Sequence, residues 1–211
     1  MEFSHNEVSQ YCTKSTTEVD KVLYELERET YLKALSPNMI SGRLQGKFLE
    51  FLSGMLQSKS ILEIGTFSGY ASICLARGLA SDGILHTIEV NPEIAWIAKK
   101  YFKKADLTKR INYYSGDARE IIPTMEIEFD LIFIDAAKPD NDFYYETVLP
   151  KLKTNGIILV DNVLWAGKVM RNAKDKDTQN IMLFNQKLKN DKRVEVVMLP
   201  LRDGLTMVRK K

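Results

Sequence analysis

Apolar and polar positions divide the chain into two parts with different periodicities. Residues 8–35 and 39–56 carry apolar side chains at helical spacing, which predicts helices. From residue 57 onward, short apolar runs alternate with longer amphipathic stretches, and this alternation predicts a mainly parallel sheet with helices on both faces. The predicted strands cover residues 61–64, 84–90, 110–114, 129–134, 157–160, 194–199 and 205–208.

The length favours one domain with a helical appendage. At 211 residues the chain can form one sizeable core but is short for two catalytic domains. We expect a single domain over 1–211, with an appendage at 1–56 and an α/β core at 57–211. Gly42 and Gly46 predict a loop that closes over a ligand. Asn91 is expected to cap a helix that begins at Pro92.

Composition narrows the class of protein. Apolar residues make up 45% and charged residues 27%, which excludes a disordered or fibrous chain. The net charge of +2 neither requires nor excludes a polyanionic partner. Only two cysteines and two histidines are present, which disfavours a thiol or zinc site. Without a membrane-spanning run or a signal peptide, we expect a cytoplasmic protein that does not bind membranes.

The stretch over residues 60–71 is the first candidate site. A short apolar strand ends at Gly65, and Gly69 precedes a predicted helix. This arrangement brings bare backbone and a helix N-terminus to a ligand, and it is typical of nucleotide-like cofactor sites. The alternative is a strand and turn that bind nothing, since two glycines at this spacing are a weak signal.

Polar residues follow successive predicted strands. Gly65, Glu89, Asp117, Asp135 and Asp161 with Asn162 all stand at such positions. The carboxyl ends of parallel strands share one edge of the sheet, so these residues are expected to converge there. Any one of these acids alone is more often a helix cap or a turn residue.

The identity of the cofactor is narrowed by two observations. Glu89 stands twenty positions after Gly69, where a carboxylate can accept both hydroxyl groups of an adenosine ribose. Phe67 occupies the position of a third glycine, which argues against a pyrophosphate. S-adenosylmethionine (SAM) fits better, with Glu63 and the amides of the turn holding its ammonium and carboxylate groups.

The residues around Asp135 and Asp161 predict a metal site and a base. Asp135, Asp161 and Asn162 offer oxygen ligands for a divalent cation, with Mg²⁺ preferred over Mn²⁺ or Ca²⁺. The alternative is an uncompensated acidic pocket or a pair of helix caps. Lys138, three residues after Asp135, can turn its ammonium over this crevice and act as a base once its pKa is lowered. Otherwise it is a surface lysine.

Four separated motifs carry a family resemblance. E-I-G-T-F-S-G-Y, F-I-D-A-A-K, V-D-N-V-L-W-A-G-K-V and D-G-L occur in this order between residues 39 and 210. The chain thus resembles the cation-dependent class I SAM O-methyltransferases of the catechol and caffeoyl-CoA type. The resemblance implies a Rossmann-like seven-stranded sheet whose last strand is antiparallel, and a homodimer. It places Lys138 as the base, Asp135, Asp161 and Asn162 at the metal, and SAM against Ser41, Glu63, Gly65, Thr66, Ser72, Glu89, Ala118 and Asp135.

The chain departs from the family pattern at three positions. Ala71 replaces a serine, so Ser72 is taken as the nearby hydroxyl. Ala137 replaces an acid, and Ala166 replaces an asparagine that touches the acyl-CoA substrate in plant members, which argues against caffeoyl-CoA itself. Trp165 is interpreted either as a wall for an aromatic ring or as plain packing.

The main hypothesis is metal-dependent methyl transfer from SAM to a hydroxyl group of a small catechol-like or phenolic acceptor. A second hypothesis keeps the same reaction, but its acceptor is a hydroxylated wobble uridine in tRNA. The near-neutral net charge disfavours an RNA substrate without excluding it. A third is a SAM-binding module without catalysis. A nicotinamide dehydrogenase is the weakest, because the glycine spacing is wrong. The N-terminal helices are the expected dimer surface.

Overall fold

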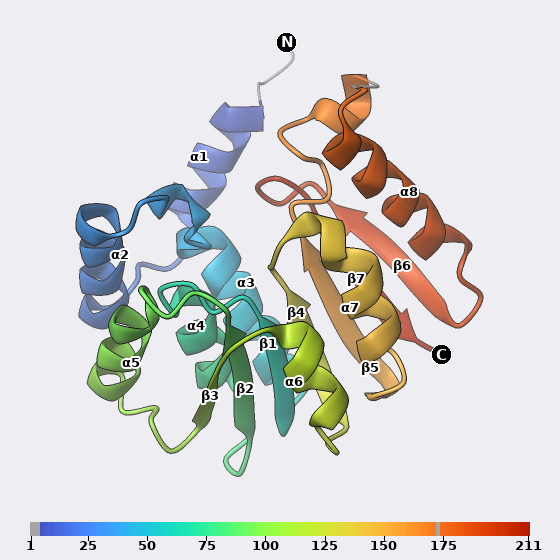
Figure 1. Ribbon diagram of the computed structural model, residues 1–211. Coiled ribbons are helices and arrows are strands. Elements are labelled where there is room, and N and C mark those ends of the chain that lie inside the picture. Colours follow the sequence, from blue (N-terminus) through green and yellow to red (C-terminus); the bar gives the residue numbers. More distant parts are fainter. Residues whose placement is uncertain (1–4, 172–173) are drawn as a thin grey trace.

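The computed structural model describes residues 5–171 and 174–211, which form a central sheet with helices on both faces (Figure 1). The seven strands of this part of the chain are ordered β3-β2-β1-β4-β5-β7-β6. Their bounds are β1 Ser60–Ile64, β2 Ile84–Glu89, β3 Ile111–Ser115, β4 Phe129–Ile134, β5 Leu152–Asp161, β6 Val194–Leu199 and β7 Leu205–Lys210.

The sheet confirms the predicted fold class. Strands β1 to β5 pair in parallel, whereas β7 is antiparallel to both of its neighbours, β5 and β6. The carboxyl ends of β1, β2, β3, β4 and β5 therefore lie along one edge. The order reverses direction between β1 and β4, and ligands of open α/β sheets bind beside such a point.

The helices form two layers that bury the two faces of the sheet. Alternate strand residues point to opposite faces, so Ile61 packs with the α3, α4 and α5 layer while Leu62 packs with the α6, α7 and α8 layer. The helices span α1 His5–Ser15, α2 Lys21–Lys33, α3 Gly42–Met55, α4 Tyr70–Gly78, α5 Ala95–Lys104, α6 Ala118–Thr124, α7 Asn141–Val148 and α8 Lys176–Asn190. Short 3-10 turns cover η1 Pro37–Met39, η2 Lys138–Asp140 and η3 Lys168–Arg171.

Helix α2 is joined to α5 by charged and polar contacts as well as by its buried leucines, Leu23 and Leu26. Glu29 of α2 accepts from Lys100 at 2.8 Å and from the Tyr101 hydroxyl at 2.7 Å, both in α5. Lys104 of α5 reaches Glu25 at 2.9 Å.

None of the helices within residues 5–171 and 174–211 has the length and apolar character needed to span a membrane. The division at residue 56 stays a prediction.

The predicted loop at Gly42 and Gly46 is wrong. Helix α3 begins at Gly42 and continues without interruption to Met55. A Cβ atom on Gly46 would lie 2.7 Å from Cε1 of Tyr70 and 2.9 Å from Sγ of Cys74. The glycine therefore allows α3 to pack closely against α4, and this contact outweighs its low helix propensity.

Two predicted boundaries also differ from the structure. The side chain of Asn91 accepts from the amide of Glu93 at 3.0 Å within a turn, and α5 begins only at Ala95, so the predicted helix start at Pro92 is wrong. Strand β5 begins at Leu152 rather than residue 157, because its first part pairs with β4 across a register shift.

Candidate active site

The glycine turn joins β1 to α4 at the carboxyl edge of the sheet. Gly65 and Gly69 have φ angles of 99° and 89°, which are left-handed and suit glycine. A Cβ atom on Gly65 would lie only 2.1 Å from the carbonyl oxygen of Asp135. The turn thus touches the end of β4, and any side chain at Gly65 would separate them.

A buried carboxylate lies directly behind this turn. Glu63 is 0% exposed, and its Oε2 accepts hydrogen bonds from the Ser72 hydroxyl and, at 2.6 Å, from the Thr87 hydroxyl. The Thr87 hydroxyl also lies 2.5 Å from that of Thr66. Burial raises the pKa of Glu63 to about 8, since a charged carboxylate loses its hydration there. Without a cationic partner, the carboxyl group is therefore mostly protonated near neutral pH.

The second carboxylate oxygen of Glu63 indicates what kind of ligand group the site can hold. Its Oε1 is buried and has no hydrogen-bond partner among the described residues. An unpartnered buried oxygen is unfavourable, and most such atoms in folded proteins are paired. An ammonium group offers both the positive charge and the donors that this atom lacks. The residues therefore fit a ligand with an ammonium group, as SAM has.

Glu89 ties three turns together at the end of β2. Its carboxylate accepts from the amide of Phe67 at 2.7 Å and from the amide of Asn91 at 2.8 Å. Its carbonyl oxygen accepts from the amide of Gly116 at 2.9 Å. Each carboxylate oxygen has two lone pairs, so both retain capacity for a ribose hydroxyl. The position predicted for ribose binding is thus rigidly held.

Ala118 is the first residue of α6 and is buried. The preceding Asp117 caps this helix by accepting from the Arg119 amide at 2.8 Å, and it also pairs with the Arg119 side chain. Asp117 is therefore a helix cap, the ordinary role of an acid in such a position.

Two further acids, Asp135 and Asp161, stand at the ends of β4 and β5 and lie close enough to interact electrostatically. Asp161 is buried and accepts from the Gln45 side chain at 2.8 Å and from the Asn162 amide at 2.8 Å. Burial, and then the negative charge of Asp135, raise the pKa of Asp161 to about 6. A cation between the two carboxylates would remove this repulsion.

The donor set suits a hard cation. Asp135, Asp161 and Asn162 provide carboxylate and amide oxygens, which Mg²⁺ and Ca²⁺ accept as ligands. Within residues 5–171 and 174–211, no three His, Cys, Asp or Glu side chains gather as a metal site. Asn162 has φ 58°, a left-handed conformation that asparagine tolerates.

Lys138 turns back toward these acids. It begins the 3-10 turn η2, and its Nζ lies 3.2 Å from Oδ1 of Asp135. Its side chain is only 10% exposed. The ammonium group therefore lies in the crevice and not on the open surface.

Three polar residues at the site were missed by sequence reasoning. Thr87 could have been noticed as a polar residue within the apolar run of β2, and Gln45 as a polar residue on the buried face of α3. Arg202, in the turn between β6 and β7, carries no comparable signal. Its Nη1 donates to the carbonyl oxygen of Ser41 at 2.7 Å. Ser41 itself is buried just before α3.

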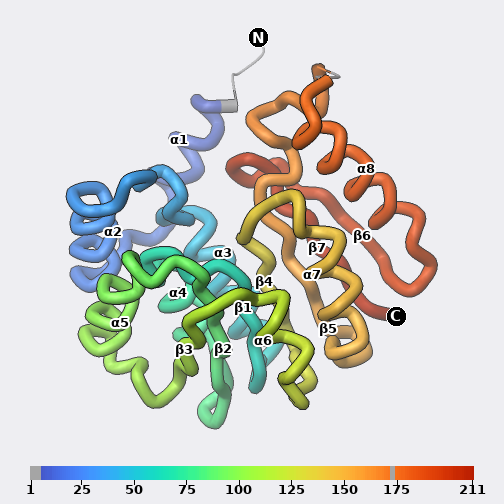
Figure 2. The backbone as a smooth tube through the Cα atoms, viewed as in Figure 1, coloured from blue at the N-terminus to red at the C-terminus, as the bar shows by residue number. Residues whose placement is uncertain are grey.

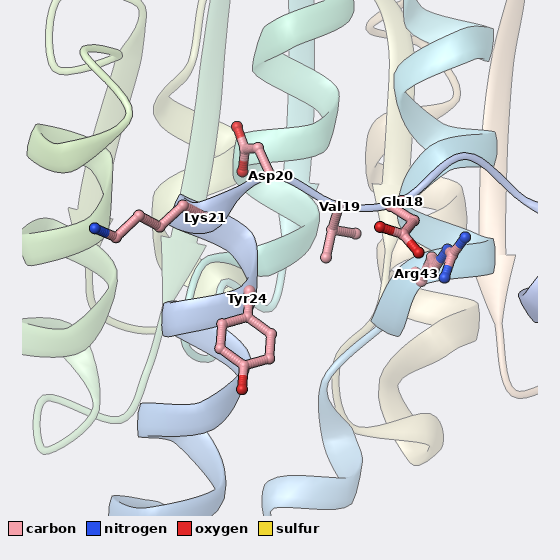
Figure 3. A pocket seen from close by; sticks show the side chains of 6 residues that line it. All are labelled: Glu18, Val19, Asp20, Lys21, Tyr24 and Arg43. Atoms are coloured by element: carbon pink, nitrogen blue, oxygen red, sulfur yellow. The ribbon is translucent and has the colours of Figure 1, made fainter.

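The hollow drawn in Figure 3 lies elsewhere, between the segment that precedes α2 and the start of α3. It has a volume of about 430 Å³ and contains none of the predicted site residues. Glu18 is directed toward Arg43, whereas Lys21 points away (Figure 3). Arg43 donates to the carbonyl oxygens of Thr16 and Thr17. The residues that line this hollow are thus distinct from those of the candidate site.

The strand order, the glycine turn and the acid that ends β2 define the class of protein. It is a Rossmann-like α/β protein with a nucleoside-type site at the carboxyl edge of its sheet. Comparison with known proteins narrows this class. The O-methyltransferase family profile matches residues 13–211. The chain belongs to this family and is an enzyme of the class I SAM-dependent O-methyltransferase type.

Individual relatives agree with this assignment. A catechol O-methyltransferase of Niastella koreensis is 36% identical over 173 residues, which are 80% of this chain and 76% of the relative. A caffeoyl-CoA O-methyltransferase of Populus kitakamiensis is 33% identical over 178 residues, covering 79% and 76%. The crystal structure of a Podospora anserina methyltransferase bound to SAH, the demethylated form of SAM, superposes with a TM-score of 0.89. It is 32% identical and covers 98% of this chain and 94% of its own.

Proposed function

We propose that this enzyme transfers the methyl group of SAM to one hydroxyl group of a small catechol-like or phenolic acceptor, with the help of a divalent cation, Mg²⁺ first. The observation that carries the proposal is the grouping of Lys138, Asp135 and Asp161 beside the turn that fits SAM. The similarity to the catechol O-methyltransferase of Niastella koreensis and the caffeoyl-CoA O-methyltransferase of Populus kitakamiensis supports the acceptor class.

Glu63 is the proposed anchor for the ammonium group of SAM, through its unpartnered Oε1. Ser72 and Thr66 would act on SAM through this anchor, because the Ser72 hydroxyl bonds to Glu63 and the Thr66 hydroxyl lies against that of Thr87, which also bonds to Glu63. Glu89 holds the ribose. The other proposed SAM contacts, provided by backbone or small side chains at the edge of the site, are Ser41, Gly65, Ala118 and Asp135.

Asp135, Asp161 and Asn162 are the proposed metal ligands. When bound there, a divalent cation supplies positive charge that favours ionisation of the acceptor hydroxyl. Lys138, whose Nζ lies 3.2 Å from Oδ1 of Asp135, is the proposed base; it would take the hydroxyl proton in its neutral amine form. The chain mainly contributes alignment of the acceptor oxygen with the methyl group and exclusion of water.

The alanine at position 166 favours a small acceptor. Ala166 provides no polar side chain where the resemblance placed a contact to an acyl-CoA substrate, whereas Ala137 only replaces an acid of the family pattern. Trp165, whose indole Nε1 has no partner among the described residues, is proposed as a wall for the aromatic ring. A free catechol suits these residues better than a CoA thioester.

The proposed assembly is a cytoplasmic homodimer formed through the N-terminal helices. Large apolar side chains of α2 and the segment after it are exposed, with Leu32 at 70% and Leu35 at 98%. Exposed apolar groups of this kind mark interaction surfaces when they gather. Sedimentation velocity of the wild type and of Leu32→Glu tests this, since the variant should sediment as a monomer; equal sedimentation of both forms would contradict it.

Labelled SAM tests the activity itself. The purified enzyme is incubated with catechol, a panel of phenols or undermodified tRNA, each with Mg²⁺ and again after EDTA. Label in a catechol only when Mg²⁺ is present is the expected result. If only tRNA is labelled, the proposed acceptor is wrong. If label is still transferred after EDTA treatment, the reaction does not need a metal. If no label is transferred at all, the protein is better explained as a SAM-binding module.

A further inference from the structure

The turn between β6 and β7 contacts two segments that flank the candidate site. This turn, drawn in red, reaches toward the start of α3 (Figure 2). On one side, the carbonyl oxygen of Asp203 accepts from the amide of Leu164 at 2.9 Å, and its carboxylate accepts from the amide of Ala166 at 2.6 Å. These bonds hold the chain that follows the proposed metal ligands Asp161 and Asn162.

Arg202 contacts the other segment. Its Nη1 donates to the carbonyl oxygen of Ser41 at 2.7 Å, and its Nη2 lies 3.5 Å from the carbonyl oxygen of Asn38. Residues 38–41 lead directly into α3 and include the proposed SAM contact Ser41. The guanidinium group thus fastens this segment to a turn about 160 residues further along the chain.

The same guanidinium group is connected to the metal end of the site. Nη1 of Arg202 lies 3.4 Å from Oε1 of Gln45, and the amide nitrogen of Gln45 donates to Oδ2 of Asp161 at 2.8 Å. Gln45 is fully buried, so its bond to Asp161 is shielded from water. Arg202 therefore contacts the segment that holds Ser41 directly, and it contacts the proposed metal ligand Asp161 through Gln45.

The backbone conformation at Arg202 is energetically unfavourable for a residue with a side chain. Its φ angle is 50°, a left-handed conformation in which a side chain is disfavoured and glycine is not. A glycine would make the same turn with less strain, but it would leave the carbonyl of Ser41 without this donor. The hydrogen bonds of the guanidinium group offset this backbone strain.

We propose that Arg202 is a positioning residue for methyl transfer, which holds residues 38–41 at the cofactor site and, through Gln45, steadies the carboxylate of Asp161. This proposal rests on the proposed function, because it takes Ser41 and Asp161 as site residues. Loss of the guanidinium group should therefore loosen residues 38–41 and weaken binding of the cofactor, with little change in folding.

The experiment compares the wild type with Arg202→Gly, Arg202→Lys and a matched control, Asn155→Gly. Asn155 is also a non-glycine residue with left-handed backbone, at φ 63°, but it lies toward the start of β5, away from the Asp161 end. Both glycine variants relieve backbone strain. Only the variant at Arg202 removes the contacts to Ser41 and Gln45.

Three readouts are measured: the Tm of the ligand-free protein, hydrogen exchange of the amides at 38–42, and the Kd of SAH by calorimetry. In Arg202→Gly, exchange should be faster by on the order of tenfold. The Kd should rise about fivefold to twentyfold, while the Tm moves by no more than about 3 °C. Arg202→Lys should give intermediate values, since an ammonium can still reach one carbonyl. Asn155→Gly should match the wild type in exchange and Kd.

The possible results separate this proposal from the proposed function. Unchanged exchange in Arg202→Gly overturns the proposal, and so does faster exchange or a lower Tm with an unchanged Kd, because Arg202 would then serve folding alone. If the wild type itself neither binds SAH nor transfers a methyl group, the proposed function fails. The exchange comparison in the ligand-free protein still decides whether Arg202 holds residues 38–41.

Discussion

Replacing Glu63 by glutamine should remove a large dependence of stability on pH. Burial raises the pKa of this carboxyl group from 4.5 to about 8, so the folded protein keeps a proton that the unfolded chain has released. Between these two values the folded state binds more protons, and the free energy of unfolding falls as pH rises. A gap of 3.5 pKa units (8 minus 4.5) corresponds to about 5 kcal/mol in total, or about 1.4 kcal/mol per pH unit within the window.

Urea unfolding of the ligand-free protein at pH 5.5, 6.5 and 7.5 measures this effect. EDTA is present so that metal binding does not contribute. The stability of Glu63→Gln relative to the wild type should increase by about 1.4 kcal/mol for each unit. Glu126→Gln makes the same chemical change at an exposed position and is the control. A difference between Glu63→Gln and the wild type that stays constant across this range would refute the reasoning.

The same carboxyl group couples SAM binding to proton release. An ammonium group beside Oε1 of Glu63 favours the ionised form, so a carboxyl with a pKa of about 8 must lose its proton on binding. At pH 7 about 0.9 protons should be released per SAM bound. Calorimetry in two buffers with different ionisation enthalpies measures this number. Glu63→Gln should release none from this position, and equal release by both proteins would contradict the proposed anchor.

Three further predictions concern other parts of the molecule. Lys138→Met should lower kcat by about 10² to 10⁴ with the Kd of SAH unchanged, as expected for loss of a base; a change confined to Kd would contradict this. Gly46→Ala should lower stability by about 1 to 3 kcal/mol in urea unfolding, because the added methyl group meets Tyr70 and Cys74; wild-type stability would show that α3 can shift freely. Gly65→Ala should abolish SAH binding, since its Cβ overlaps the carbonyl of Asp135 and its backbone is left-handed; calorimetry with wild-type affinity would contradict that.

The centre of the sheet could be predicted from the sequence because its inner strands β1 and β4 are buried on both faces. Runs such as residues 61–64 and 129–134 are almost continuously apolar, and their order alternates with amphipathic helices. Acids after these strands then meet at one edge, since parallel strands share their direction. This is why Glu89, Asp135 and Asp161 could be expected at the same edge of the sheet from the pattern alone.

The contacts that were not predicted join residues far apart in the chain. Gln45 and Asp161 are separated by 116 positions, and Arg202 and Ser41 by 161. No local periodicity encodes such pairs. Gly46 was misjudged for a related reason, because its low helix propensity is a local property whereas its packing against α4 is a tertiary one.

The central claim is that Asp135, Asp161 and Asn162 hold a divalent cation beside the SAM site. Mn²⁺ is a paramagnetic substitute for Mg²⁺, so titration followed by electron paramagnetic resonance counts bound ions directly. The account predicts one tight site per chain in the wild type, displaced by excess Mg²⁺ and lost in Asp161→Asn. Binding that is absent in the wild type, or equally strong in that variant, would contradict it.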